Sequence, residues 1–508
     1  MSTISSLQKP IAPPIQKETT VGNYFVSNYP PFSFWKPESV PDILAALEKP
    51  PTHNYLSPDA SRPSPPPLGI YLHIPFCRKR CHFCYFKVYT DKDSTAIRAY
   101  IDAALKELSL YAQKPVIGGR NANFVYFGGG TPSYLSVDQL KYLTDGMKKL
   151  IPWNGVEEVT FECEPGTLTD HKLKAIREMG VTRLSLGIEN FSDHILEING
   201  RAHRSKEVYR AYNYAREINF PQINIDLIAG MVEETEENWR DCVAKTIALS
   251  PDSVTIYQME IPYNTTIYQE MKAAGKLIAP VADWETKRNW VKYAFAELEK
   301  NGYTVGSAYT AVKTQGSTGH WPVSSGGSPD EMGGMSQLDS STTASSTSPA
   351  IPVGESPPGT GRLPVPPTKF IYRDKLWAGA DLLSLGVASF GHFSGTHYQN
   401  HHEFETYVTK INQGELPIFR ALTPNDDERL IREFVLQLKL GHVSCEYFQK
   451  QFGVDVRQRF AAPLQTLSDW GFGKIEGDTI SLNRDGLLQV DRLLHEFFLP
   501  QHKNARYA

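Results

Sequence analysis

The chain has 508 residues, a net charge of −4 at pH 7 and 41% hydrophobic residues, so it can form two or three domains with a large core. This charge gives no bulk attraction to nucleic acid or to acidic membranes, and we expect no nucleic-acid partner. No apolar run of about 18 residues occurs, so we expect no membrane span. The first residues, MSTISSLQKPIAPPIQ, lack the apolar core of a secretory signal, and we therefore expect a cytoplasmic protein.

Residues 1–67 predict an N-terminal arm, because they are rich in Pro and Ser and carry few periodic apolar positions. Only Val40–Leu47 has the pattern of a short helix. We expect aromatic residues to order part of the arm, namely Tyr24, Tyr29, Phe32 and Trp35.

Residues 68–313 alternate short β-rich runs with amphipathic helical segments. The expected strands are 70–74, 124–127, 158–161, 183–187, 223–228, 253–257 and 303–305. The expected helices are 95–112, 137–150, 172–179, 206–217, 236–249 and 284–300. Strand–helix units in series predict a parallel α/β sheet, and six or more predict a full or partial barrel.

The remaining chain divides into three parts. Residues 314–368 are dominated by Ser, Gly, Pro and Thr and predict a disordered low-complexity insertion. Apolar content resumes in 369–419, which we expect to close the barrel. Residues 420–508 predict helices at 425–440, 444–451, 456–470 and 484–497 around a hairpin at 473–482, a winged-helix-like domain. It has no basic stripe on one helix, which argues against DNA binding.

Three of the six cysteines form the pattern Cys77-x3-Cys81-x2-Cys84, directly after an expected strand. Thiolates favour zinc or iron–sulfur clusters, and zinc normally takes four ligands. Three thiolates on a four-iron cluster would leave one iron open for a substrate or cofactor. The carboxyl end of a barrel strand is where active sites form. A zinc knuckle or buried free thiols are the alternatives.

Further candidates follow later strands. Gly128-Gly129-Gly130-Thr131-Pro132 lets backbone groups approach a ligand closely, so its amides and carbonyls could bind an amino-acid moiety. Glu162 ends another strand and could accept from an ammonium or ribose. Asp226 ends an apolar strand and needs a partner if buried, for which Arg201 is a candidate.

The cysteine spacing, within the string YLHIPFCRKRCHFCYF, resembles the radical S-adenosylmethionine (SAM) superfamily. It is similar to the branch that contains oxygen-independent coproporphyrinogen III oxidases and haem chaperones. The resemblance implies a partial (β/α)6 barrel with a helical C-terminal domain. It also implies a 4Fe-4S cluster held by the three cysteines, one or two SAM molecules, and hydrogen abstraction by a 5′-deoxyadenosyl radical.

The same resemblance assigns roles at matching positions. Gly129, Gly130 and Thr131 would hold the methionyl end of SAM, and Glu162 matches a Glu of the oxidases. Tyr71 would lie near the sulfonium and Phe83 near the adenine. Glu189, Arg201 and Asp226 match a second SAM-contacting set, although family members usually carry Gln in place of Glu189. The residues expected to act in catalysis are Tyr71, Glu189, Arg201 and Asp226.

Three activities fit this branch. An oxidase of porphyrin and haem biosynthesis would decarboxylate tetrapyrrole propionates, using an electron donor such as flavodoxin or ferredoxin. The arm at 27–31 and the stretch at 380–387 favour it, whereas Phe86 replaces the oxidases' fourth cysteine. Phe86 and the stretch at 164–167 favour a haem chaperone, although the chaperones' His-Asn pair is missing near Tyr372. A radical SAM methyltransferase or cyclopropanase with two SAM molecules is the third possibility.

Overall fold

The computed structural model describes residues 24–52, 55, 64–275, 281–314, 369–503 and 505. Apart from Thr314, the predicted low-complexity insertion at 314–368 lies outside the described residues.

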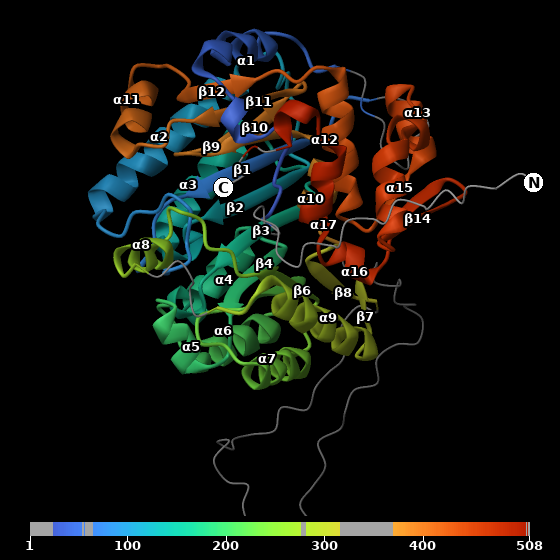
Figure 1. The fold of residues 1–508 in the computed structure, drawn as a ribbon. Helices are drawn as coiled ribbons and strands as arrows, with labels where there is room; N and C mark the ends of the chain where they lie inside the picture. Colours follow the sequence, from blue (N-terminus) through green and yellow to red (C-terminus); the bar gives the residue numbers. More distant parts are fainter. Residues whose placement is uncertain are drawn as a thin grey trace, which may run out of the picture.

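A twelve-stranded sheet runs through the molecule in the order β12-β11-β10-β9-β1-β2-β3-β4-β5-β6-β8-β7 (Figure 1). Its central strands are β1 (Leu68–Ile74), β2 (Phe124–Gly129), β3 (Glu158–Cys163), β4 (Arg183–Glu189), β5 (Gln222–Ala229) and β6 (Ser253–Gln258). The helices that connect or follow these strands are α2 (Ser94–Ala112), α3 (Val137–Leu150), α4 (Asp170–Glu178), α5 (Asp193–Ile198), α6 (Ser205–Glu217), α7 (Glu236–Leu249), α8 (Thr266–Ala273) and α9 (Trp284–Lys300). The predicted strand–helix series is thus confirmed, although the sequence missed the short helices α5 and α8 and the edge strand at Thr310–Lys313.

The prediction of a parallel sheet holds for the centre and is wrong for both edges. Strands β1 to β6 are parallel in chain order, and β9 (Asp381–Leu385) is parallel to the other side of β1. Antiparallel strands complete the sheet, namely β7 (Tyr303–Val305), β8 (Thr310–Lys313), β10 (Phe390–Phe393), β11 (Thr396–Asn400) and β12 (Ile418–Leu422). The links between β7 and β8, and between β9 and β10, are too short for a crossover helix, so these chains reverse direction. Within the described residues, the barrel is partial.

Local sequence explains the central elements. In α3, the Ser136 side chain accepts from the Gln139 amide while the Gln139 side chain accepts from the Ser136 amide, a capping box. Leu140, Leu143 and Met147 then form the buried face of this helix, at the spacing that one face of a helix requires. The central strands are buried on both faces, as strands of a parallel sheet between helices must be.

The N-terminal arm packs on the antiparallel edge of the sheet. Helix α1 (Val40–Leu47) lies over β10 to β12, with Ile43 and Leu47 buried (Figure 1). Tyr29 is fully buried against the rings of Phe498 and His502, as expected from the arm's aromatic residues. Within the described ranges, six short 3-10 helices occur, at Phe32–Phe34, Pro37–Ser39, Pro132–Tyr134, Pro165–Thr167, His495–Phe497 and Pro500–His502.

The C-terminal unit is winged-helix-like. After α10 (Ile371–Trp377) and α11 (Phe404–Asn412), the chain forms α12 (Asp426–Leu438), β13 (His442–Ser444), α13 (Cys445–Phe452), α14 (Val456–Arg459), α15 (Ala461–Asp469), β14 (Gly473–Glu476), β15 (Thr479–Leu482), α16 (Arg484–Leu487) and α17 (Val490–Leu494). The predictions of single helices at 456–470 and 484–497 are wrong, because the first forms α14 and α15 and the second forms α16, α17 and a 3-10 helix. Strands β13, β15 and β14 form the small antiparallel sheet of the wing.

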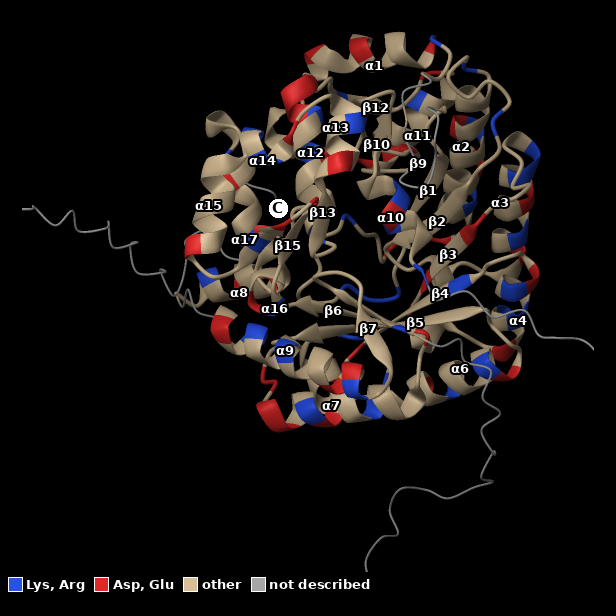
Figure 2. Cartoon of the chain, turned by 90° about the vertical axis from the view of Figure 1, so that its right-hand side faces the viewer, with Lys and Arg blue, Asp and Glu red and all other residues tan. Residues whose placement is uncertain are grey.

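Charged residues of both signs are interspersed along the helices around the sheet (Figure 2). This distribution agrees with the small net charge of the sequence. Among the described residues, no helix combines the length and hydropathy needed to cross a membrane.

One buried ion pair ties the arm to the C-terminal unit. Lys439, at the end of α12, is fully buried with its ammonium 2.9 Å from Asp491 of α17. The same ammonium donates to the Val26 carbonyl at 2.7 Å, and the Val26 amide donates to Asp491 at 2.9 Å. Three chain segments therefore satisfy one another's polar groups inside the hydrophobic core that the arm shares with the C-terminal unit.

Replacing Lys439 with Met should lower the free energy of unfolding by about 3–5 kcal/mol, because Asp491 would stay buried without its countercharge. Denaturant titration measures this loss. The matched control is Lys450→Met, which breaks the exposed pair with Glu446 and should change stability little. Equal losses in the two variants would contradict the structural role of the buried pair.

Candidate active site

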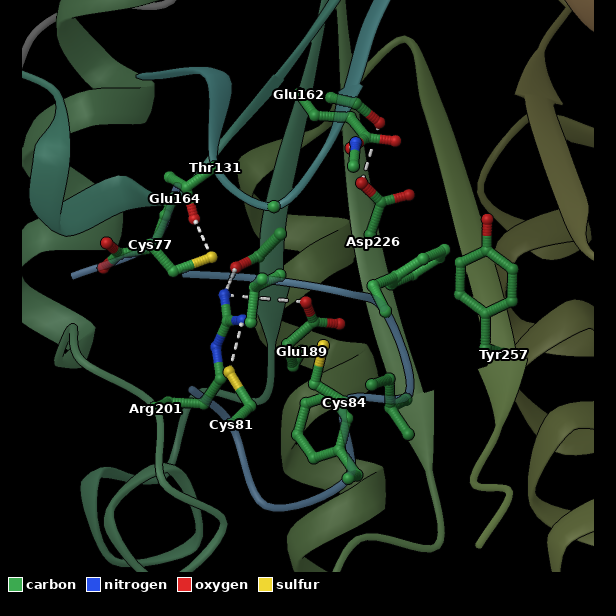
Figure 3. A pocket seen from close by; sticks show the side chains of 18 of the residues that line it. Cys77, Cys81, Cys84, Thr131, Glu162, Glu164, Glu189, Arg201, Asp226 and Tyr257 are labelled. Carbon is green, nitrogen blue, oxygen red and sulfur yellow. Dashed lines mark hydrogen bonds and ion pairs between the residues drawn. The ribbon is translucent and has the colours of Figure 1, made fainter. Parts of the chain in front are cut away.

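A cavity of about 400 Å³ opens at the carboxyl ends of the central strands (Figure 3). Most of the residues that the sequence singled out line it together, namely Cys77, Cys81, Phe83, Cys84, Gly129, Gly130, Thr131, Glu162, Glu189, Arg201 and Asp226. Tyr71 is the exception and does not belong to the lining. The predicted convergence at the strand ends therefore follows from the parallel order of β1 to β6.

The cysteine loop folds back on itself as soon as β1 ends. The Cys77 amide donates to the Tyr89 carbonyl at 3.0 Å, and the Tyr89 amide donates to the Pro75 carbonyl at 2.7 Å. The His82 amide donates to the Asn199 carbonyl at 3.1 Å, which fastens the tip of the loop to the end of α5. These main-chain bonds hold all three cysteines at the cavity.

Two polar groups touch the cysteine sulfurs. The Thr131 hydroxyl donates to Cys77 Sγ at 3.3 Å, and the Arg201 guanidinium donates to Cys81 Sγ at 3.3 Å (Figure 3). Burial raises the pKa of Cys77 to about 12 and the pKa of Cys84 to about 11. These thiols therefore keep their protons at neutral pH until a cation at the site stabilises the thiolates.

The glycine-rich turn lies directly against the cysteine loop. A Cβ atom on Gly130 would stand 2.7 Å from the Ile74 carbonyl oxygen and 3.1 Å from Cys77 Sγ, so a side chain there would collide with the loop. The amides of Gly130 and Thr131 donate to the Ile74 and Phe76 carbonyls. The Gly129 amide donates to Glu162 at 3.0 Å. The protein itself uses these amides to close the turn, so the carbonyls of the turn are the backbone groups left for a ligand, and the predicted role of the turn in SAM binding stays a prediction.

Glu162 stands at the end of β3 and points into the cavity. Its carboxylate accepts from the Tyr126 hydroxyl at 2.6 Å and from the Gly129 amide at 3.0 Å. Burial raises the pKa of Glu162 to about 7, and the nearby Asp226 raises it further while Tyr126 opposes the shift. The site thus holds a carboxyl group that gains charge close to neutral pH.

Arg201 connects the cysteine loop to β4. Its guanidinium donates to the Gly187 carbonyl and lies 3.6 Å from the Glu189 carboxylate. A β-bulge between Gly187 and Glu189, where Glu189 has a φ of 65°, turns the Glu189 side chain toward Arg201. Burial raises the pKa of Glu189 to about 7 although Arg201 opposes the shift.

The expected pairing of Arg201 with Asp226 is wrong. Asp226 instead accepts from the Ser185 hydroxyl at 2.7 Å and from the Asn224 amide group at 2.8 Å. Ser185 and Asn224 are register partners on β4 and β5, two residues before the pair of Gly187 and Asp226. The bulge that follows places Glu189 nearer to Arg201. Burial raises the pKa of Asp226, and these hydrogen bonds offset part of that rise.

Phe83 and Tyr71 have different environments. Phe83 packs against an apolar cluster of Ile195, Ile228, Met231 and Met259 at the cavity wall. Tyr71 lies behind the wall, where its ring stacks on Tyr126 and its hydroxyl is 3.1 Å from His73 Nδ1. Tyr71 therefore acts on the site only through its neighbours, Tyr126 and His73, and His73 lies against Gly129.

Sequence reasoning missed several residues of the cavity wall, namely Tyr126, Arg183, Ser185, Thr255, Tyr257 and Glu260. Most of them are polar positions within otherwise apolar strands. Thr255 and Tyr257 follow the two-residue alternation that places side chains on one face. Polar residues at every second position near the end of a strand indicate side chains on the cavity face, and this pattern could have predicted Thr255 and Tyr257.

The donor set fits a 4Fe-4S cluster with SAM. Three thiols face one cavity, and the buried Nε atoms of Arg183 and Arg201 have no hydrogen-bond partner in the described structure. Such guanidinium donors suit the carboxylate of an amino-acid moiety, and the neighbouring acids suit a cationic group. Among the described residues, no three His, Cys, Asp or Glu side chains lie close enough together to hold a single metal ion.

Residues 71–245 match the family described as the Radical SAM superfamily. This stretch contains the cysteine loop, the glycine-rich turn and the acids of β3 to β5, so the chain carries a radical SAM domain. The superfamily uses a 4Fe-4S cluster and SAM, which are the cofactors of this site. The fold agrees, because coproporphyrinogen III oxidase from Escherichia coli, described as a radical SAM enzyme, has a TM-score of 0.71 at 20% identity, over 93% of this chain and 96% of that one.

The curated relatives fall into two groups. The haem chaperones HemW of Haemophilus influenzae and Bacillus subtilis are 35% and 33% identical, over 40% and 46% of this chain. The chain spans only 54% and 60% of the length of these two chaperones. The oxygen-independent coproporphyrinogen III oxidase of Escherichia coli is 25% identical over 84% of this chain and 80% of its own length.

Replacing Cys77, Cys81 or Cys84 with Ala should abolish the cluster, which we expect to contain about four iron and four sulfide per chain. Anaerobic reconstitution followed by iron and sulfide analysis and visible absorbance measures this loss. Cys242→Ala and Cys445→Ala are matched controls, because both thiols are buried away from the cavity and should leave the iron content unchanged. Stoichiometric zinc without iron–sulfur absorbance would contradict the assignment.

The raised pKa of Glu162 predicts a pH-dependent stability of the cluster-free chain. The folded protein keeps the carboxyl proton up to about pH 7, whereas the unfolded chain loses it near the ordinary value of 4.5. The folded state therefore binds more protons in this window, and stability falls as pH rises through it. Glu162→Gln removes the titrating carboxyl group. The fall in Tm between pH 5 and pH 8 should therefore be about 2–4 °C smaller in this variant than in the unaltered protein.

Thermal unfolding at several pH values measures the effect. Glu178→Gln is the control, because its side chain is exposed on α4 and its loss should leave the profile as it is. A Glu162→Gln profile parallel to that of the unaltered protein would show that Glu162 is already ionised in the fold.

Proposed function

We propose that the protein is a radical SAM oxidoreductase that acts on the propionates of a tetrapyrrole, in the manner of the oxygen-independent coproporphyrinogen III oxidases. The single observation that carries the proposal is one cavity that joins the three cysteines to two buried arginines and a wall of aromatic side chains. The oxidase relatives support it, since they align over most of the chain.

The cavity suits a large flat ligand. Tyr85 and Phe86 stack on each other at 4.6 Å between ring centroids, and they are 40% and 45% exposed. Tyr257 of β6 is 42% exposed and lines the same cavity (Figure 3). Exposed aromatic rings at a cavity provide area for stacking on a macrocycle.

Arg201 and Arg183 suit the carboxylates of such a substrate. Both guanidinium groups line the cavity and each keeps a buried Nε without a partner among the described residues. Arg201 is held in position by Gly187, Glu189 and the Cys81 sulfur, so it is preorganised for an anion. Glu162, Glu189 and Asp226 balance this charge and favour the cationic groups of SAM. Tyr71 supports Tyr126 as a positioning residue.

The cofactors, when bound and reduced, supply a 5′-deoxyadenosyl radical that abstracts a hydrogen atom from the substrate. Each propionate then loses carbon dioxide and one further electron to an external acceptor, which leaves a vinyl group. The chain's own residues bind the carboxylates, orient the side chain and exclude water from the reacting carbon. A reductant such as flavodoxin or ferredoxin and a reducing cytoplasmic location are parts of the same proposal.

A haem chaperone is the second candidate. Phe86 stands where the oxidases carry a fourth cysteine, and the chaperones have higher identity over a shorter aligned stretch than the oxidases. This activity would use the same cavity for binding rather than for decarboxylation.

Incubation of the reduced, cluster-loaded protein with SAM and coproporphyrinogen III should yield vinyl-bearing porphyrinogen and 5′-deoxyadenosine. Anaerobic turnover with mass detection measures both products. Deoxyadenosine without a decarboxylated porphyrinogen would reject the oxidase proposal, and stoichiometric haem binding would then support the chaperone.

Arg201→Gln should keep the cluster and reduce turnover by about a hundredfold, the scale expected when one positioned charged donor is lost. Arg240→Gln is the matched control, because Arg240 pairs with Glu236 on the exposed face of α7, outside the cavity. Equal activity in the two variants would remove Arg201 from the proposed substrate site.

A further inference from the structure

A second cavity, of about 320 Å³, lies between α12 and the antiparallel edge of the main sheet. Its polar walls come from His392 of β10, His397 of β11, and Arg429 and Arg432 of α12. None of its lining residues also lines the active-site cavity. It is therefore a separate polar chamber that the proposed reaction does not use.

A hydrogen-bond chain fixes the proton of His397. Arg432 Nε donates to the Asn28 side-chain oxygen at 2.7 Å, which orients the Asn28 amide group. The Asn28 Nδ2 group then lies 3.3 Å from His397 Nδ1. Because Nδ2 can only donate, Nδ1 accepts, and the ring proton of the neutral imidazole is on Nε2.

The Tyr29 carbonyl is a second neighbour of this ring, but the Nε2 atom itself makes no hydrogen bond in the described structure. His397 is fully buried, and its Nε2 atom makes no hydrogen bond. The ring stacks flat on Trp35 at 5.2 Å between centroids, so it cannot turn away without losing that contact. A buried donor without an acceptor is costly, which indicates that a ligand atom accepts here.

The arginines point to the same ligand charge. Arg432 is only 6% exposed, and the neighbouring Glu433 carboxylate supports its charge. Burial lowers the pKa of Arg432 to about 10, which leaves it charged at neutral pH. Arg429 has a buried Nε atom without a partner, and its outer nitrogen lies 3.7 Å from the exposed Asp426.

The acids of the chamber are already engaged. Asp381 pairs with Arg120 at 2.9 Å and accepts from the Ser394 amide at 3.0 Å. Glu433 accepts from the Tyr447 hydroxyl and from Gln437. Glu433 and Asp426 offset part of the charge of Arg432 and Arg429, and the unpaired Nε of Arg429 and Nε2 of His397 remain for a ligand.

We propose that this chamber binds a small molecule through an oxyanion, either a phosphate or a carboxylate group. Its oxygens would accept from His397 Nε2, Arg429 and Arg432, the donor types that bind such groups most strongly. The volume is at the lower end of small-molecule sites, which fits a small metabolite rather than a polymer.

Titration of the cluster-loaded full chain with inorganic phosphate and, separately, with acetate tests the site, with chloride at equal ionic strength as the reference. Thermal unfolding and calorimetry should show saturable binding of one of the two anions beyond the chloride effect. The anion that binds more tightly identifies the group. Arg429→Gln should weaken binding by about ten- to a hundredfold. Arg459→Gln removes the same charge from the surface beside Asp427 and should not weaken it.

Arginine modification by phenylglyoxal provides a test on the unaltered protein. The anion that binds more tightly in the titration should protect Arg429 from modification, as measured by peptide mass spectrometry, and should leave Arg459 reactive. The proposal is overturned if neither anion binds more tightly than chloride, or if Arg429 and Arg459 respond alike in both experiments.

Discussion

The candidate active site depends on one largely buried cation. Arg201 contacts the Cys81 sulfur on one side and the Gly187 carbonyl and Glu189 carboxylate on the other, so a single guanidinium connects the cysteine loop to the end of β4. Burial opposes its charge, yet the Cys81 sulfur and Glu189 together hold the pKa of Arg201 above its usual range. The rest of the cavity is arranged around this fixed positive charge.

Around Arg201, the protein keeps three acids in an environment that disfavours their charge. Glu162, Glu189 and Asp226 all have raised pKa values, with burial as the main cause. A cationic ligand would relieve this cost by stabilising the carboxylates, so binding of SAM would be coupled to loss of protons. Tyr126 holds the Glu162 carboxylate, and Ser185 and Asn224 hold that of Asp226, which limits rearrangement of these two acids when a ligand binds.

Local patterns predicted most of the fold and of the site. The strand–helix periodicity located the central elements, and the cysteine spacing, the glycine-rich turn and the strand-end acids converge on one cavity because parallel strands place their carboxyl ends together. The ion-pair partners of the buried charged side chains could not be predicted. The partner of Arg201 is Glu189 rather than Asp226, because a bulge shifts the register by one residue, and no local pattern reveals that bulge. The chamber of His397 joins segments more than 350 residues apart, from Asn28 to Arg432, so its chemistry exists only in the folded chain.

The central claim is that Cys77, Cys81 and Cys84 hold a cluster whose fourth iron is open to SAM. Electron paramagnetic resonance of the reduced protein, with and without SAM, tests it most directly. The account predicts the signal of a reduced 4Fe-4S cluster that changes shape when SAM is added, because the cofactor would become a ligand of the open iron. An identical signal in the presence of saturating SAM would contradict the account.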